Sequence, residues 1–165
     1  MKSLTHMAAN ILKTANVQTK IKLSKEYSDT RFHDRKNYNR ISIGNAACPD
    51  IPSKPNKPEL LPPRSMPKRK IGTESGKIAL IHSVAHIEFN AIDLHWDIIA
   101  RFGHMKFPIS FYDDWVSAAR DETKHFELLS RLLIDRESYY GALPAHDSMW
   151  DAAKITNNDI LGRLA

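Results

Sequence analysis

Residues 76–102 read GKIALIHSVAHIEFNAIDLHWDIIARF, and residues 107–133 read FPISFYDDWVSAARDETKHFELLSRLL. In both stretches apolar residues recur at intervals of three and four positions, which is the period of an amphipathic α-helix. Thr73 is a candidate N-cap for the first stretch. The pattern therefore predicts a helix from Thr73 to about Phe102, then a loop, then a second helix over about 110–137.

Each expected helix carries one glutamate in the middle of its apolar side. Glu88 has apolar residues one turn away in both directions, and Glu122 follows two alanines and precedes Phe126. His125 lies three residues after Glu122 and therefore beside it on the helix surface, which completes a Glu-x-x-His motif. A carboxylate inside an apolar stripe is costly to bury unless it is paired or bound to a metal.

One Glu from a helix together with Glu-x-x-His from the next is the ligand pattern of di-iron and di-manganese carboxylate bundles. Two divalent cations need anionic oxygens between them, and the i,i+3 spacing lets a carboxylate and an imidazole reach the same ion. We therefore expect Glu88, Glu122 and His125 to be metal ligands, with two divalent ions (Fe or Mn) in a complete site.

Two alternatives to metal binding stay open for these glutamates. They could form buried ion pairs with Arg101, Arg120 or Arg131. The helix faces could also be assigned one residue out, which would leave both carboxylates in solvent.

Other polar residues on the first helix have several interpretations. His82 and His86 have the i,i+4 spacing of a zinc pair, but no acid or Cys stands near to complete that set. His86 and His95 are candidates for supporting the metal ligands through hydrogen bonds, although surface or core packing is the simpler role for each. Asp93 and Asp97 are expected to face solvent.

Charge and proline are unevenly distributed over the 165 residues, whose formal net charge is +5. Residues 1–77 hold 16 Lys and Arg against 6 Asp and Glu, whereas residues 78–165 hold 8 against 13. We expect a basic segment over 1–48, a proline-rich strap or linker over 49–72, and a helical domain over 73–165. The basic half, with its cluster of Arg64, Lys68, Arg69 and Lys70, could bind RNA phosphates.

The N-terminal residues predict one short amphipathic helix, from about Leu4 to Leu23. The first 25 residues contain no acid, as in some mitochondrial presequences, but the bases are lysines rather than arginines, so a cytoplasmic location is favoured. No apolar run is long enough to span a membrane. At the other end, Asp147 or Ser148 could cap a third helix that runs to about Leu164.

Several blocks occur in order along the chain: the proline-rich lead-in that ends PELLPPRSMPKRK, then AHIE-x-x-AIDL, FYDDW, DE-x-x-HF and LPAHD. In this order they resemble a bacterial ferritin-like family of unknown function, over about residues 49–165. The resemblance implies an all-α, ferritin-like four-helix core with a dinuclear site, in which Glu88 is the carboxylate of the first helix and Glu122 and His125 are the pair of the second. Related ferritin-like proteins include tRNA-modifying hydroxylases, rubrerythrins and iron stores, so redox or oxygen-activating chemistry is expected by analogy.

Members of that family continue beyond the position of Ala165, through helices that would supply a further Glu and a second Glu-x-x-His. The resemblance therefore implies a C-terminally truncated chain, with the first two to three helices of the bundle and half of the ligand set. Two copies related by a two-fold axis would complete that set, which makes a homodimer an expected partner arrangement. A non-catalytic remnant and an RNA-associated protein are the competing interpretations.

Overall fold

The computed structural model describes residues 3–36, 41–68, 70 and 72–164. Within these residues the chain forms helices and no strand. The helices are α1 (Leu4–Leu12), α2 (Val17–Lys36), α3 (Glu74–Arg101), α4 (Ile109–Ile134), α5 (Ser148–Ile155) and α6 (Ile160–Leu164), with 3₁₀ turns at Pro63–Ser65 and Gly103–Met105. None of the helices in this described part is long and apolar enough to cross a bilayer.

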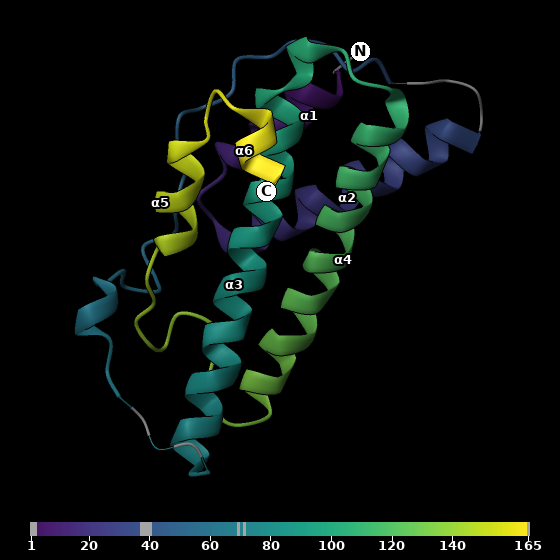
Figure 1. Cartoon of the computed structure of the whole chain (residues 1–165). Coiled ribbons are helices and arrows are strands. Elements are labelled where there is room, and N and C mark those ends of the chain that lie inside the picture. The colour runs from purple at the N-terminus through teal and green to yellow at the C-terminus, as the bar shows by residue number, and fades with distance from the viewer. Residues whose placement is uncertain (1–2, 37–40, 69, 71, 165) are drawn as a thin grey trace.

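The two longest helices, α3 and α4, lie side by side and form the centre of the molecule (Figure 1). Both expected helices are confirmed, including the N-cap: the Thr73 hydroxyl accepts a hydrogen bond from the Gly76 N–H at 3.0 Å. α4 ends three residues earlier than expected, where the Asp135 N–H closes the last turn on the carbonyl of Arg131. All-helical architecture therefore follows from the periodicity of these two stretches.

The single N-terminal helix that we expected is wrong, because the chain bends after Leu12 and makes two helices. Lys13 ends α1, and the side chain of Asn16 accepts from the N–H of Thr19 at 2.9 Å, which starts α2. The Asn16 side chain thus satisfies one of the backbone N–H groups at the start of α2. In a continuous helix a carbonyl of the preceding turn would accept from that N–H.

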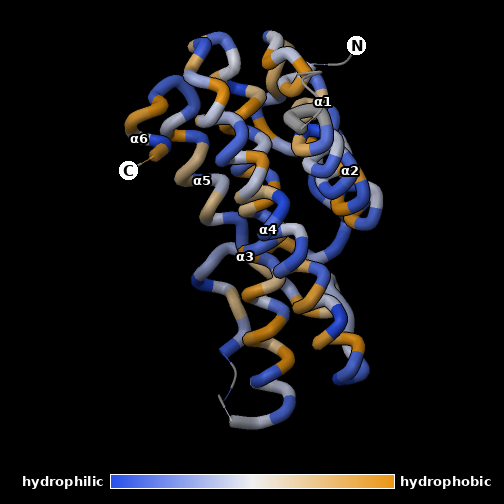
Figure 2. The backbone as a smooth tube through the Cα atoms, turned by 90° about the vertical axis from the view of Figure 1, so that its right-hand side faces the viewer, coloured by the Kyte–Doolittle hydropathy of each residue, from blue (hydrophilic) through white to orange (hydrophobic). Residues whose placement is uncertain are grey.

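Helices α1 and α2 pack on the same side of the α3–α4 pair, as the two views at right angles show (Figures 1 and 2). The apolar residues of α1 are buried against α3, and the indole of Trp96 donates to Ser24 of α2 at 2.9 Å. The most buried large side chains of the protein gather in this layer: Leu4, Ile11, Leu12, Phe89, Ile92, Trp96, Ile99, Tyr112 and Leu133. The opposite side of the pair receives no such cover from α1 and α2.

Residues 49–62 run as an extended segment along a second side of α3. The backbone N–H of Ser53 donates to Leu12 at the end of α1, and residues 59–61 pair with Ala145 through two backbone hydrogen bonds and an isolated bridge. Prolines leave this segment few donors and favour extended backbone. The segment thus connects α1, α3 and the loop before α5.

Asp93 and Asp97 lie under this cover, so the expectation that they face solvent is wrong. Asp93 and Lys20 form an ion pair in which both side chains have no solvent exposure, with Nζ 2.6 and 2.7 Å from the two carboxylate oxygens. Asp97 accepts from Arg101 at 2.7 Å and from Arg163 at 2.6 Å. Cations from distant parts of the chain neutralise both carboxylates, which is what makes their burial tolerable.

The third expected helix is also divided in two, because residues 156–159 form turns between α5 and α6. Arg163 of α6 folds back and donates to the carbonyl of Ala153 and to Asp97. The buried side of α5 is made by Trp150 and Ala153.

Candidate metal centre

Glu88, Glu122 and His125 lie together in the groove between α3 and α4, on the side away from α1 and α2. One ligand atom from each lies within 4.8 Å of the ligand atoms of the other two. His125 Nδ1 is 2.8 Å from Glu122 Oε2 and 3.7 Å from Glu88 Oε2. We call these three residues the carboxylate–histidine cluster.

The fold explains this meeting in simple geometric terms. α3 and α4 run antiparallel, and each presents its glutamate near the middle of the contact between them. Their neighbours Ala85 and Ala119 are fully buried, so the two backbones approach closely at this level. The cluster stays open to solvent, since the side chains are 19% exposed for Glu88, 24% for Glu122 and 53% for His125.

The two carboxylates influence one another strongly. Partial burial, together with a hydrogen bond to Glu122 and the negative charge there, raises the pKa of Glu88 to about 7. Burial alone would raise the pKa of Glu122 as well, but the hydrogen bonds from Glu88 and His125 outweigh it and hold that pKa below its usual value. The same Glu122 hydrogen bond raises the pKa of His125. The two carboxylates thus share a hydrogen bond, and in the described part of the chain both form their ion pair with His125.

Arginine does not neutralise the cluster, which was one of the alternatives to metal binding. Arg101 is engaged with Asp97, and Arg120 is paired with Asp29 of α2 at 2.8 Å. Among the residues that the structure describes, Glu88 and Glu122 form ion pairs with His125 and with no arginine. The second alternative, full solvation, also does not hold, because both carboxylates are largely shielded in the groove.

The two histidines named as supporting candidates lie in different places. His95 is on the same side of α3 as Glu88, with its ring 5.2 Å from that of Trp115, and its buried Nδ1 has no partner among the described residues. Burial lowers its pKa, and the charge of Glu122 acts in the opposite direction. His95 therefore brings an unpartnered ring nitrogen to the same side of α3 as Glu88 and within the electrostatic influence of Glu122.

His86, by contrast, has no contact with the cluster. It precedes Glu88 by two residues, so the two side chains leave α3 about 200° apart. Its Nδ1 is 2.9 Å from the hydroxyl of Tyr140, and its Nε2 is 3.2 Å from the carbonyl oxygen of His146. Both nitrogens are thus engaged on the opposite side of the helix.

Apolar side chains of both long helices are exposed. Leu80 and Ile87 of α3 and Leu128 and Leu132 of α4 are 60, 48, 56 and 41% exposed. A helix pair usually buries such residues against a neighbour. The periodicity of the sequence placed the three residues of the cluster on facing sides of the two helices, and their ligand atoms are close together in the structure.

Comparison with known proteins identifies the family. Residues 13–165 match the model of a family described as a protein of unknown function, DUF455. An uncharacterised protein of Haemophilus influenzae is 36% identical over 160 residues, which cover 93% of this chain and 56% of the relative. The chain thus spans little more than half the length of that relative, and no solved structure gives a significant match. On this evidence the chain belongs to the DUF455 family of proteins of unknown function.

Proposed function

We propose that the carboxylate–histidine cluster binds divalent transition metal ions, and that the chain is a ferritin-like metal carboxylate protein with redox chemistry. The observation that carries the proposal is the convergence of two carboxylates and an imidazole within 4.8 Å. Carboxylate oxygen with imidazole nitrogen is a donor set that suits Fe and Mn. A bound cation would also supply the positive charge that Glu88 and Glu122 lack.

The residues of the cluster fit such an ion in their chemistry. Glu88 and Glu122 offer four oxygens between them, enough for terminal and shared coordination, and His125 offers one nitrogen. When bound, iron or manganese would supply electron transfer or oxygen activation. The chain's own part is to hold these donors close together, and the small residues Ala91 and Ala118 leave space beside them.

Metal loading tests the proposal directly. Equilibrium dialysis against Mn(II), or anaerobically against Fe(II), should load the protein, and Glu122→Gln should weaken binding about tenfold or more. Asp121→Asn is a matched control, because Asp121 is the adjacent carboxylate, is exposed and pairs with Lys124 at 2.7 Å. Equal metal content in the parent and in Glu122→Gln would overturn the proposal and favour a non-catalytic remnant.

We also propose that a second copy of the chain completes the site. The cluster supplies three donor groups, while a pair of bundle metals usually has two Glu and two Glu-x-x-His contributions. A two-fold axis over the open groove would bring together six donors and would cover the exposed leucines and isoleucine of both copies. We choose a second copy as the partner because a two-fold axis lets each copy bring its three donor groups to a shared site of six.

Analytical ultracentrifugation with and without Mn(II) tests this arrangement. We expect a dimer that Mn(II) strengthens in the parent and in Asp121→Asn, but not in Glu122→Gln. Leu128→Glu should weaken the dimer, because it places a charge in the covered apolar area. A parent that stays monomeric while it binds Mn(II) normally would overturn the dimer and leave the metal site standing.

RNA binding by the basic half stays a prediction. Lys20, Arg31 and Lys54 of that half are engaged with Asp93, Asp113 and Asp147 of the acidic half, so these three cations are not available to phosphates. Arg69, part of the basic cluster named above, lies outside the described residues. A steep loss of RNA binding with added salt would support this function.

A further inference from the structure

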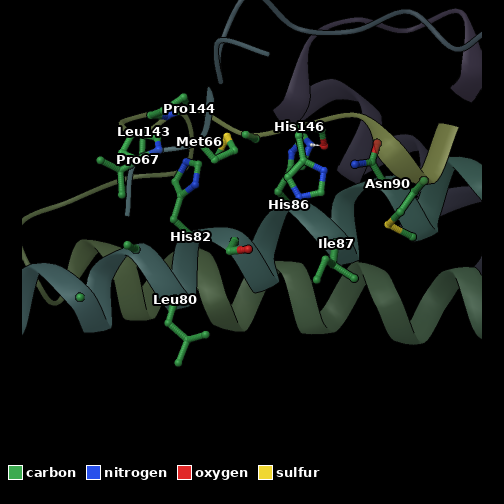
Figure 3. Close-up of a pocket in the computed structure, with 15 residues that line it drawn as sticks. Met66, Pro67, Leu80, His82, His86, Ile87, Asn90, Leu143, Pro144 and His146 are labelled. Carbon is green, nitrogen blue, oxygen red and sulfur yellow. Dashed lines mark hydrogen bonds between the residues drawn. The ribbon is translucent and has the colours of Figure 1, made fainter. Parts of the chain in front are cut away.

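A cavity of about 290 Å³ lies against the side of α3 that faces away from the carboxylate–histidine cluster (Figure 3). Its floor is the first half of α3, and its roof is Met66 and Pro67 together with the loop residues 143–146 and Met149. Figure 3 shows the roof residues above His82 and His86. The size is near the lower limit for small-molecule sites, and the walls are mostly apolar, as in such sites generally.

The imidazoles in the floor are already used by the protein. His86 donates from Nε2 to the carbonyl of His146, so its Nδ1 accepts from the hydroxyl of Tyr140. Burial lowers the pKa of His86 to about 4, which leaves the ring uncharged at neutral pH. His82 Nε2 accepts from the N–H of Gly141 at 2.9 Å. These rings support the loop and add no charge to the cavity.

Asn90 is the polar group that remains open to the cavity. Its side chain is almost fully buried, with 1% exposure, and it lines the cavity beside His146 (Figure 3). Its Oδ1 accepts from Lys54 Nζ at 2.8 Å, which fixes the orientation of the amide. Within the described part of the chain its Nδ2 makes no hydrogen bond, and it is not one of the fully enclosed polar atoms. A donor that opens on the cavity in this way can bond to a ligand or to water there.

The charges around Asn90 are balanced. Lys54 Nζ is 3.0 Å from Asp147, and the neighbouring Lys20 is paired with Asp93. A carboxylate ligand would therefore enter a mostly apolar cavity whose described lining residues include no free cation, which is costly. An uncharged carbonyl oxygen needs only the donor that Asn90 provides.

We propose that this cavity binds a small, uncharged and mainly apolar molecule whose carbonyl oxygen accepts a hydrogen bond from Asn90 Nδ2. The site is separate from the metal centre, because Asn90 follows Glu88 by two residues and leaves α3 about 200° away from it. Lys54 polarises the amide from its oxygen side and makes Nδ2 a better donor. The apolar walls select the body of the molecule, and Asn90 selects its oxygen.

Three probes of nearly equal shape test this assignment: acetophenone, isopropylbenzene and benzoate. Titration followed by protein NMR should show saturable binding of acetophenone at the Asn90 side-chain amide. Isopropylbenzene lacks the acceptor and should bind about tenfold more weakly, the size expected for one buried hydrogen bond. Benzoate should bind more weakly than acetophenone, because it brings an unpaired charge.

Two variants and a control separate the contributions. Asn90→Asp keeps an oxygen for Lys54 but replaces the donor by an acceptor, so acetophenone should lose its advantage over isopropylbenzene. Ala79→Leu places a larger side chain in the cavity floor and should weaken acetophenone and isopropylbenzene together, at an unchanged melting temperature. Asn10→Asp, at an exposed asparagine of α1, should change neither.

Three results would overturn the proposal. Tighter binding of benzoate than of acetophenone would show an anion site. Equal acetophenone affinity in the parent and in Asn90→Asp would show that the amide takes no part. Unchanged binding in Ala79→Leu would place the probes outside this cavity.

Discussion

Two sides of the same helix, α3, treat charge in opposite ways. On the side covered by residues 49–62 and by α5, Asp93 and Asp97 are fully buried, and each carboxylate has a cation from elsewhere in the chain. On the open side, Glu88 lies beside Glu122 and His125, and none of these three side chains is fully buried. The difference shows that the side of α3 covered by other segments is the side whose carboxylates are neutralised by cations of the same chain. The side that it leaves open carries two carboxylates whose ion-pair partner among the described residues is His125.

The covered side should give the largest effect when its charge balance is broken. Asp93→Ala leaves the Lys20 ammonium buried with no carboxylate, and the cost of such an unpaired charge is about 3–5 kcal/mol. Chemical denaturation should show a matching fall in the free energy of unfolding. The double variant Lys20→Met with Asp93→Leu removes both charges and should recover most of the loss.

A small loss in Asp93→Ala, or a double variant no better than the single, would contradict this account of the covered side. Lys20 Nζ also donates to the carbonyl of Ser53 at 3.2 Å, and Lys20→Met removes this hydrogen bond as well. The recovery in the double variant is therefore a lower limit on the free energy that removing the unpaired charge returns.

The same side should make stability fall in mild acid. His86 has a pKa of about 4 in the fold, below its ordinary value of 6.5. Between these values the unfolded chain binds more protons than the folded one, so stability is present above pH 6.5 and is lost as pH falls toward 4. The loss between pH 7 and pH 5 should be about 2 kcal/mol, measured by urea denaturation at each pH.

His86→Gln is the control for that slope, because glutamine can still donate to the carbonyl of His146 but does not titrate. The variant should lose less stability than the parent between pH 7 and pH 5. If both fall equally, other groups such as His95, whose pKa burial also lowers, account for the acid sensitivity.

The long helices could be predicted because their determinants are local. The periodicity of α3 and α4 and the Thr73 cap depend on residues a few positions apart, and the structure agrees with them. The Glu88, Glu122 and His125 cluster could likewise be predicted, since it depends only on one side of each helix and on their antiparallel contact. Which residues of α3 are buried by the other segments of the chain was harder to predict.

The burial of Asp93 and Asp97 could not be read from the sequence, because their partners are distant along the chain. Lys20 is 73 positions from Asp93, and Arg163 is 66 positions from Asp97. An aspartate on a polar helix side is most often solvated. No residue close to Asp93 or Asp97 in the sequence indicates that residues 49–62 will cover them. The cavity donor Asn90 was missed for the same reason, since its roof comes from residues 66–67 and 143–149.

A third prediction concerns the attachment of the last helix to the covered side. Arg163 donates to Asp97, to the carbonyl of Ala153 and to Thr156, and its side chain is only 6% exposed. Arg163→Ala should release α6 and cost about 1–2 kcal/mol, since Asp97 keeps Arg101 as a partner. Hydrogen exchange should quicken in α6 while α3 stays protected, and uniform loss of protection would contradict a local role.

The open side should give the smallest change in stability, and that contrast is the sharpest test of the comparison. The pKa of Glu88 is raised, so its ionised form is disfavoured in the fold, and stability should fall as pH rises through 7. Glu88→Gln removes this contribution, and because water reaches the cluster through the half-exposed His125, the metal-free variant should gain no more than about 0.5 kcal/mol at pH 8. At pH 5 the parent Glu88 is protonated, and the two proteins should melt alike.

A large loss in the variant would mean that Glu88 holds the helices together, as Asp93 does on the other side. Near-equal stability combined with lost Mn(II) binding would instead show a carboxylate kept for a ligand rather than for the fold.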